Sequence, residues 1–310
     1  MIRAEHLTKK YGSLTALRDV SFRIEKGETV GLLGRNGAGK TTLLSLLTGC
    51  FPPEDGDVFI GEKSMMGEPA ACKRQIGFLP ERPPLYDEMT TESYLRFVCE
   101  LREVRKQGIR EHVEEILALC GLQEVRGRVL GHLSKGYRQR AGIAQALCGA
   151  PEILILDEPT VGLDPRQTVE IRELIRRLSG EHTVIFSSHL LSEVQQACTR
   201  VIILDEGRMV LDYDAQRPEN KEIKVRLSIA GDEKTVISRL RHLDGVLGAE
   251  ALPREEDGVA EIRLTAARGE NSGEALDRLF RVLAGSGLAV RMMREERESL
   301  EEIFLRAVQG

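Results

Sequence analysis

Residues 34–41 read GRNGAGKT, and this stretch decides the fold. Its spacing fits the pattern G-x-x-x-x-G-K-[ST]. The apolar run at residues 29–33 predicts a strand just before it, and leucines at helical spacing follow at residues 43–47. Between a strand and a helix, such a loop can wrap its backbone around phosphate oxygens, with the positive end of the helix dipole pointing inward. The alternative, a glycine-rich turn that happens to precede Lys-Thr, is weak in this context.

This loop supplies most of the predicted nucleotide contacts. We expect Lys40 to neutralise charge on the β- and γ-phosphates and to assist catalysis there, and Thr41 to ligate Mg²⁺. The nucleotide-binding residues predicted in the loop are Gly34, Arg35, Asn36, Gly37, Ala38, Gly39, Lys40, Thr41 and Thr42.

A second motif places two adjacent carboxylates at the end of an apolar strand. Residues 153–156 read ILIL, and Asp157, Glu158 and Pro159 follow. A parallel sheet delivers such residues to its carboxyl edge, where ligands bind. Because side chains alternate along a strand, we expect Asp157 to hold the Mg²⁺ shell while Glu158 faces the γ-phosphate and orients or deprotonates the attacking water. The alternative is an ordinary acidic turn before Pro159.

Residues 133–140 read LSKGYRQR and open a helical stretch, and here the chain resembles the ABC ATPase family. The family pattern is a Walker A loop, an L-S-G-G-Q-like signature, a Walker B strand ending in Asp-Glu and a switch histidine; all four occur in this order within residues 1–215. The resemblance implies a head-to-tail dimer, in which Ser134 and Gly136 of one subunit complete the ATP site of the other. Lys135 and Tyr137 depart from the family pattern. A serine-capped helix start also forms an anion site on physical grounds, although it can equally be an ordinary cap.

The same resemblance implies four further site residues. Asp164, in the stretch VGLD, matches the loop that crosses the dimer interface, and His189 matches the histidine that contacts the γ-phosphate. Tyr11 resembles the aromatic residue that stacks on adenine, although a tyrosine in a turn more often packs against its neighbours. Glu81 follows a predicted strand at residues 76–80, where the family usually has Gln. We expect it to ligate Mg²⁺ while adding negative charge beside the γ-phosphate.

The chain length and a polar break in the sequence predict two domains. A chain of 310 residues is long for a single domain, and a break rich in Pro, Asn, Lys and Glu lies at residues 217–221. The first predicted domain, residues 1–217, is an α/β P-loop NTPase of the ABC ATPase type. It combines a parallel sheet covered by helices, an antiparallel β-layer with short strands near 2–7 and 20–24, and a helical subdomain at about 85–149. The second, residues 218–310, is a small α+β ferredoxin-like unit of order βαββαβ, followed by a last helix at 299–308. We expect it to serve regulation or dimer support.

Composition narrows the function further. With a formal net charge of -5, the protein has no overall positive field that would attract the phosphate backbone of nucleic acids, so no nucleic-acid partner is expected. No apolar stretch approaches the roughly 18 residues of a membrane helix, so a membrane role must come through a partner. The six cysteines show no C-x-x-C spacing and lie in apolar segments, which fits a reducing cytosol.

Taken together, these features predict an ATP-hydrolysing subunit of an ABC transporter, with ATP and Mg²⁺ as cofactors. The resemblance implies a homodimer, or a pair with another ABC ATPase, bound to a multispanning permease at the cytoplasmic side of the cell membrane. Residues 77–86 (GFLPERPPLY), the KGY signature variant and residues 299–305 resemble the ATPases of ABC-2-type exporters, including drug-export and gliding-motility subunits. In this family a permease helix docks beside the Glu81 loop, and Pro83 to Tyr86 give that loop a rigid, apolar surface, although a Pro-rich surface turn explains them equally well.

Two other functions remain open at this point. A soluble ABC ATPase acting on nucleic acid or ribosomes is weakened by the single nucleotide-binding lobe, the acidic charge and the lack of a long coiled-coil insert. A nucleotide-dependent scaffold that barely hydrolyses is weakened by Glu158.

Overall fold

The computed structural model describes residues 1–198, 200–214, 222–253, 256, 258–267 and 272–296. The described residues fall into two compact units, one before and one after the segment 215–221. The sequence break predicted at residues 217–221 lies in that segment. The helix predicted at 299–308 lies outside the described residues.

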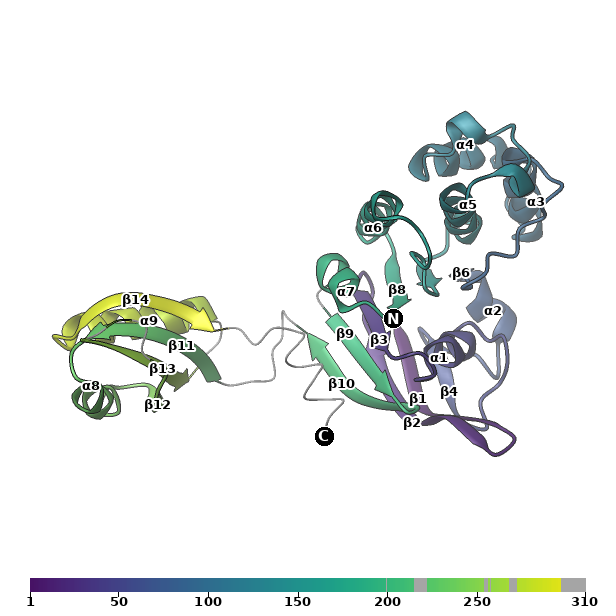
Figure 1. The fold of residues 1–310 in the computed structure, drawn as a ribbon. Coiled ribbons are helices and arrows are strands. Elements are labelled where there is room, and N and C mark those ends of the chain that lie inside the picture. Colours follow the sequence, from purple (N-terminus) through teal and green to yellow (C-terminus); the bar gives the residue numbers. More distant parts are fainter. Residues whose placement is uncertain (199, 215–221, 254–255, 257, 268–271, 297–310) are drawn as a thin grey trace. The chain divides into compact units, whose positions relative to one another are not determined.

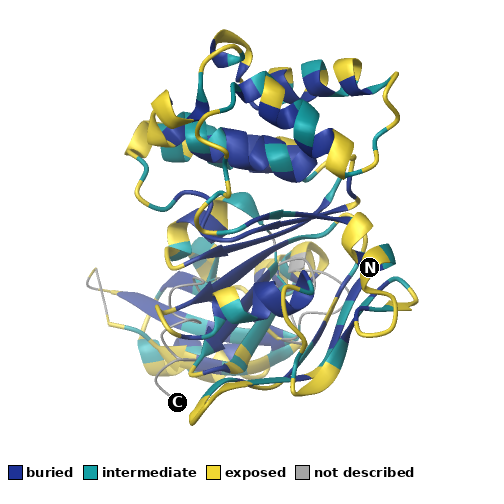
Figure 2. Ribbon diagram, turned by 90° about the vertical axis from the view of Figure 1, so that its right-hand side faces the viewer, coloured by how far each residue is buried: buried dark blue, intermediate teal, exposed yellow. Residues whose placement is uncertain are grey.

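A six-stranded sheet forms the centre of the first unit (Figure 1). Its order is β10-β9-β3-β8-β7-β6, and all neighbours are parallel except the β9–β10 pair. Its strands are β3 (Thr29–Gly34), β6 (Ile76–Leu79), β7 (Ile153–Leu156), β8 (Thr183–Ser188), β9 (Arg200–Asp205) and β10 (Arg208–Asp214). Buried residues run along these central strands (Figure 2), as continuous aliphatic runs predict for a sheet covered on both faces.

A second, antiparallel sheet of order β2-β1-β4-β5 lies in the same unit. Its strands are β1 (Ile2–Tyr11), β2 (Leu14–Ile24), β4 (Asp55–Ile60) and β5 (Lys63–Ser64). The prediction of two short strands with Tyr11 in the turn between them was wrong in extent. Tyr11 pairs with Leu14 as the last residue of β1, because register shifts let the pairing continue through the polar residues of this hairpin.

Helices connect the strands and build the predicted helical subdomain. Helices α1 (Lys40–Leu47), α2 (Pro69–Arg74), α6 (Pro165–Leu178) and α7 (Leu191–Ala197) belong to the strand connections. The subdomain consists of α3 (Thr91–Leu101), α4 (Ile109–Leu119) and α5 (Lys135–Leu147), with single 3₁₀ turns η1 (Gln123–Val125) and η2 (Leu130–His132) between α4 and α5. Strands β4, β5 and β10 and helix α2 were not predicted.

Helix α5 packs on β6 at very short range through two glycines. A Cβ at Gly77 would lie 2.0 Å from the carbonyl oxygen of Ala146. One at Gly142 would lie 2.6 Å from Cδ1 of Leu79 and 2.9 Å from Cβ of Pro83. The strand backbone therefore lies directly against the helix backbone at Gly77, and the helix backbone lies against the side chains of Leu79 and Pro83 at Gly142.

The second unit is one four-stranded antiparallel sheet with two helices. It contains β11 (Glu222–Ala230), α8 (Glu233–Leu240), β12 (Val246–Ala251), β13 (Val259–Ala267), α9 (Ser272–Gly285) and β14 (Ala289–Glu296). The strand order β12-β13-β11-β14 is that of a ferredoxin-like sandwich and confirms the predicted fold class. None of the helices in the described residues is both long and apolar enough to span a bilayer.

Candidate nucleotide-binding and catalytic site

The glycine-rich loop joins β3 to α1 at the carboxyl edge of the central sheet. Gly37 and Gly39 have φ of 84° and 103°, in the left-handed region that glycine adopts without strain. A Cβ at Gly39 would also lie 2.6 Å from the carbonyl oxygen of Ala16. Glycine is therefore required here both for the turn and for the close approach of β2, and the loop is held at the N-terminus of α1.

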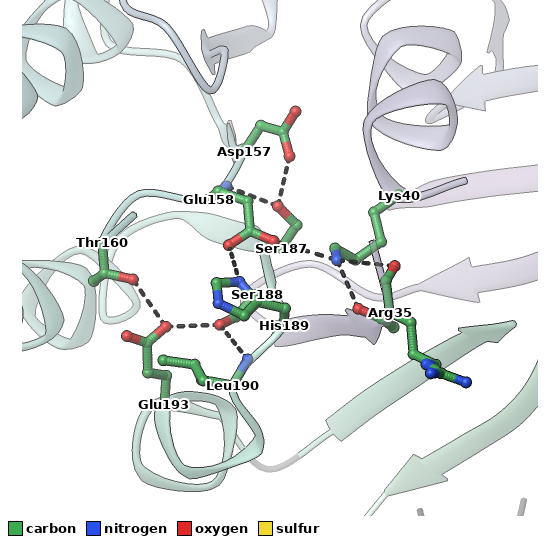
Figure 3. A network of polar contacts seen from close by, with 11 residues as sticks. Arg35, Lys40, Asp157, Glu158, Thr160, Ser187, Ser188, His189, Leu190 and Glu193 are labelled. Carbon is green, nitrogen blue, oxygen red and sulfur yellow. Dashed lines mark hydrogen bonds and ion pairs between the residues drawn. The ribbon is translucent and has the colours of Figure 1, made fainter. Parts of the chain in front are cut away.

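Lys40 is the first residue of α1 and is almost completely buried. Its Nζ donates to the carbonyl oxygen of Gly34 at 2.6 Å and lies 3.2 Å from Oε1 of Glu158 (Figure 3). The ammonium group therefore stands between the glycine-rich loop and the acidic end of β7.

Asp157 and Glu158 follow β7 and their side chains diverge, as expected, although the left-handed backbone of Glu158 and not strand alternation sets its direction (Figure 3). Asp157 is fully buried; its Oδ1 accepts a hydrogen bond from Ser187 Oγ at 2.6 Å, and its Oδ2 has no partner. Glu158 has a φ of 46°, rare for a residue other than glycine, and its backbone N–H donates to the same Ser187 Oγ at 2.7 Å. Ser187 thus fixes both acidic residues from the neighbouring strand β8.

The surroundings of Asp157 fit a cation. Burial raises the pKa of Asp157, and the charges of Glu158 and Glu81 raise it further, whereas the nearby hydroxyl groups of Ser187 and Thr41 lower it. No group of three or more His, Cys, Asp or Glu side chains that could hold a metal by itself occurs among the residues the structure describes. Mg²⁺ characteristically takes one or two protein ligands and completes its shell with waters and substrate phosphates. The Thr41 hydroxyl and the unpartnered Asp157 oxygen suit that role.

His189 follows β8, and its ring contacts the catalytic candidate. Nδ1 of His189 lies 2.9 Å from Oε2 of Glu158, while Lys40 approaches the other carboxylate oxygen (Figure 3). The structure therefore brings the three predicted catalytic residues into one chain of contacts: Lys40, Glu158 and His189.

These groups open onto a cavity of about 760 Å³. The cavity is lined by eleven of the predicted residues, namely Tyr11, Arg35, Asn36, Gly37, Gly39, Lys40, Thr41, Thr42, Glu81, Glu158 and His189. Gly34, Ala38 and Asp157 are buried and do not line it. Sequence reasoning missed Leu14, Thr15, Ala16, Arg18, Val161, Glu206 and Gly207, which also line it. Only the fold brings β2 and the β9–β10 turn to this place, so no local motif could have indicated their residues, whereas Val161 begins the VGLD stretch that was matched through Asp164.

Tyr11 stands at the open side of this cavity, with 47% of its surface exposed. Its ring meets Phe51 edge to face, with centroids 6.5 Å apart, and Lys9 Nζ lies 5.8 Å from its centroid. An exposed ring beside a phosphate loop can stack on a base, as the resemblance implied.

Ser134, Gly136 and Asp164 line a different cavity, of about 360 Å³. Ser134 is the N-cap residue of α5, but its side chain makes no capping hydrogen bond and is exposed. Oδ1 of Asp164 caps α6 by accepting from the N–H of Gln167 at 2.8 Å. Within one chain, these three residues are therefore not part of the cavity that the glycine-rich loop lines.

Glu81 lines the main cavity just beyond β6 and is exposed. We expect Glu81→Gln to change the Kd for MgATP by less than about threefold, because the amide oxygen still reaches the metal or its waters while one negative charge is removed. Equilibrium titration with a fluorescent nucleotide measures this, with the exposed Glu88→Gln as control. Complete loss of binding in Glu81→Gln would refute this role.

A phosphate loop, an Asp-Glu pair and a histidine, gathered at one sheet edge and joined to a helical subdomain, define a phosphate-loop nucleoside triphosphatase. Comparison with known proteins is more specific. Residues 17–161 match the ABC transporter family model. The chain is 32% identical to the bacitracin transport ATP-binding protein BcrA of Bacillus licheniformis, over 100% of this chain and 98% of that protein. It is 38% identical to the ABC transporter ATP-binding protein NatA of Bacillus subtilis, over 66% of this chain and 87% of that one.

Solved structures agree with this comparison. The dimeric ATP-binding cassette MJ0796, in a post-hydrolysis state bound to ADP and Pi, superposes with a TM-score of 0.63 at 26% identity. The superposition covers 69% of this chain and 99% of the cassette. The chain belongs to the ABC transporter ATP-binding protein family. It is the ATP-binding and ATP-hydrolysing subunit of a transporter, and the transport function is supported over the nucleic-acid or ribosome alternative.

Proposed function

We propose that this ATPase closes on ATP and Mg²⁺ as a head-to-tail dimer. The dimer would act at the cytoplasmic side of a membrane and drive a separate multispanning permease that exports its substrate. One observation carries the proposal. Two cavities in the first unit are lined by residues predicted to bind nucleotide, one by the glycine-rich loop and the other by Ser134, Gly136 and Asp164. Two copies facing each other would complete both sites.

We assign the residues of the glycine-rich loop and its neighbours the following roles. Lys40, Thr41 and the backbone of the loop would bind the phosphates, and Tyr11 would stack on the base. Asp157, Thr41 and Glu81 would hold Mg²⁺, which neutralises phosphate charge. Glu158 would orient and deprotonate the attacking water, with His189 fixing its carboxylate and contacting the γ-phosphate.

The state of Ser134 supports its role toward a second subunit. Its hydroxyl is exposed and does not cap its own helix, so it is available as a donor at the positive end of α5. Asp164, by contrast, uses its carboxylate as a cap, which supports a role in shaping the interface loop rather than in direct nucleotide contact.

Coupling to a permease is supported by the loop after Glu81. The hydroxyl of Tyr94, whose pKa is raised to about 12 by burial, donates to the carbonyl oxygen of Pro84 at 3.2 Å. The rings of Tyr94 and Phe97 both pack on Tyr86, which remains 53% exposed. The loop is thus anchored on α3 and presents an aromatic surface beside the site, suitable for a permease helix.

Light scattering after size exclusion tests the dimer. We expect the full chain carrying Glu158→Gln to have twice the mass of one chain with MgATP and the mass of one chain without it. The double variant Glu158→Gln/Ser134→Arg should stay monomeric with MgATP, because the long cationic side chain would occupy the place of the partner's nucleotide. Ser238→Arg, at an exposed position in α8, is the matched control. Dimerisation that survives Ser134→Arg would contradict the proposed interface.

Affinity purification from detergent-solubilised membranes tests the permease. Recovery of a multispanning protein with the full chain, reduced by Tyr86→Asp, is the expected result. Stimulation of ATP hydrolysis by nucleic acid or ribosomes, without such a partner, would favour the soluble alternative.

A further inference from the structure

One buried carboxylate beside the site has no role in the functions above. Glu193 lies in the first turn of α7 with 9% of its surface exposed. Its Oε2 accepts hydrogen bonds from Thr160 Oγ1 at 2.8 Å and from Ser188 Oγ at 2.7 Å. No lysine, arginine or histidine among the described residues pairs with it. Two hydroxyl donors are what compensates the burial of this carboxylate.

Its two partners come from the two loops that carry the catalytic candidates. Thr160 stands two residues after Glu158, and Ser188 directly precedes His189. Both are buried, with 9% and 1% of their surfaces exposed. Ser188 Oγ also accepts from the N–H of Leu190 at 3.0 Å, which fixes the chain on both sides of His189.

These contacts close a ring, which Figure 3 shows. It runs from Glu158 through the backbone to Thr160, across to Glu193, on to Ser188 and His189, and returns through the 2.9 Å contact between His189 Nδ1 and Glu158 Oε2. Of the residues in this ring, Glu193 is the one that belongs neither to the segment of Glu158 nor to the segment of His189. It therefore joins the two loops on the side away from the Glu158–His189 contact.

The backbone of Glu158 needs such support. Its φ of 46° lies in the left-handed region, which non-glycine residues hold only where their surroundings determine it. Ser187 holds its N–H at 2.7 Å. The Thr160–Glu193 bond holds the chain just beyond it, so loss of that bond would allow the loop to relax and the carboxylate to turn away from His189.

We propose that Glu193 is a positioning residue for ATP hydrolysis, which keeps Glu158 and His189 in register by tying their two loops together. The inference rests on the roles proposed for those two residues. It requires an acceptor oxygen at position 193 and does not require the negative charge.

Steady-state hydrolysis and nucleotide titration by the full chain test the inference. In Glu193→Ala, kcat should fall about tenfold to hundredfold, the range that small misplacements of reacting groups produce, while the Kd for MgATP stays within about twofold. Glu193→Gln keeps an oxygen for both hydroxyls and should retain at least about a third of wild-type kcat. The exposed Glu173→Ala, on α6, controls for loss of a helical glutamate.

A double-mutant comparison separates positioning from general destabilisation. If Glu193 acts through the Glu158–His189 pair, the loss of kcat in His189→Ala/Glu193→Ala should be clearly smaller than the product of the two single losses. Wild-type kcat in Glu193→Ala, multiplicative losses in the double variant, or Glu193→Gln as slow as Glu193→Ala would each overturn the inference. Full activity of His189→Ala or Glu158→Gln would instead overturn the roles proposed for those residues.

Discussion

Replacing Glu158 by Gln should lower kcat for ATP hydrolysis by about 10²- to 10⁴-fold, the range that a positioned general base contributes. Gln keeps the shape and still meets His189, but it cannot accept the proton of the attacking water. The Kd for MgATP should stay within a few fold or fall, because one negative charge leaves the neighbourhood of the γ-phosphate. Single-turnover hydrolysis and equilibrium titration of the same preparation measure both quantities.

The exposed Glu173→Gln provides the control for this change and should match the wild type. If Glu158→Gln hydrolyses ATP at the wild-type rate, the attacking water must be activated by another group. The contacts from Lys40 through Glu158 to His189 would then not serve catalysis.

Replacing Lys40 by Ala should raise the Kd for MgATP about tenfold to hundredfold, because a charge-assisted hydrogen bond contributes about 1.5–3 kcal/mol. Among the described residues, the buried ammonium contacts the Gly34 carbonyl, the Arg35 carbonyl and Glu158, and it can exchange these partners for phosphate oxygens. Isothermal titration with MgATP measures the loss.

Lys63→Ala, at an exposed position in β5, is the matched control. Thermal unfolding of each variant should accompany the titration, because Lys40→Ala also leaves Glu158 buried without its cation. Unchanged affinity in a stable Lys40→Ala protein would exclude Lys40 as a phosphate ligand.

The site residues that could be predicted are those that lie together in one short stretch of sequence. The phosphate loop and the Asp157-Glu158 pair could be identified because one short segment carries each motif and the flanking apolar runs indicate strand or helix. Strands β4 and β10 were missed because one glycine and two aspartates open DGDVFI, and charged residues begin and end RMVLDYD, which leaves no clear alternation. Tyr11 was placed in a turn for a related reason, because polar residues interrupt the apolar pattern of β1 before the strand ends.

The supporting contacts could not be predicted in the same way. Thr160 and Glu193 are 33 residues apart, and neither lies in a motif that indicates the other. Two serines ending a buried strand, at positions 187 and 188, were the available signal that hydroxyls would be needed there. Their partners depend on how β7, β8 and α7 pack, which sequence periodicity does not specify.

The glycine-mediated contact between α5 and β6 has a mechanical consequence for the proposed dimer. Gly77 and Gly142 bring the backbone of the strand that leads to Glu81 against the helix that begins at Ser134. Glu81 lines the cavity of the glycine-rich loop in its own subunit, whereas Ser134 would face the nucleotide of the opposite one. Because they are packed this closely, strand and helix would shift together, so that filling one site would move a wall of the other.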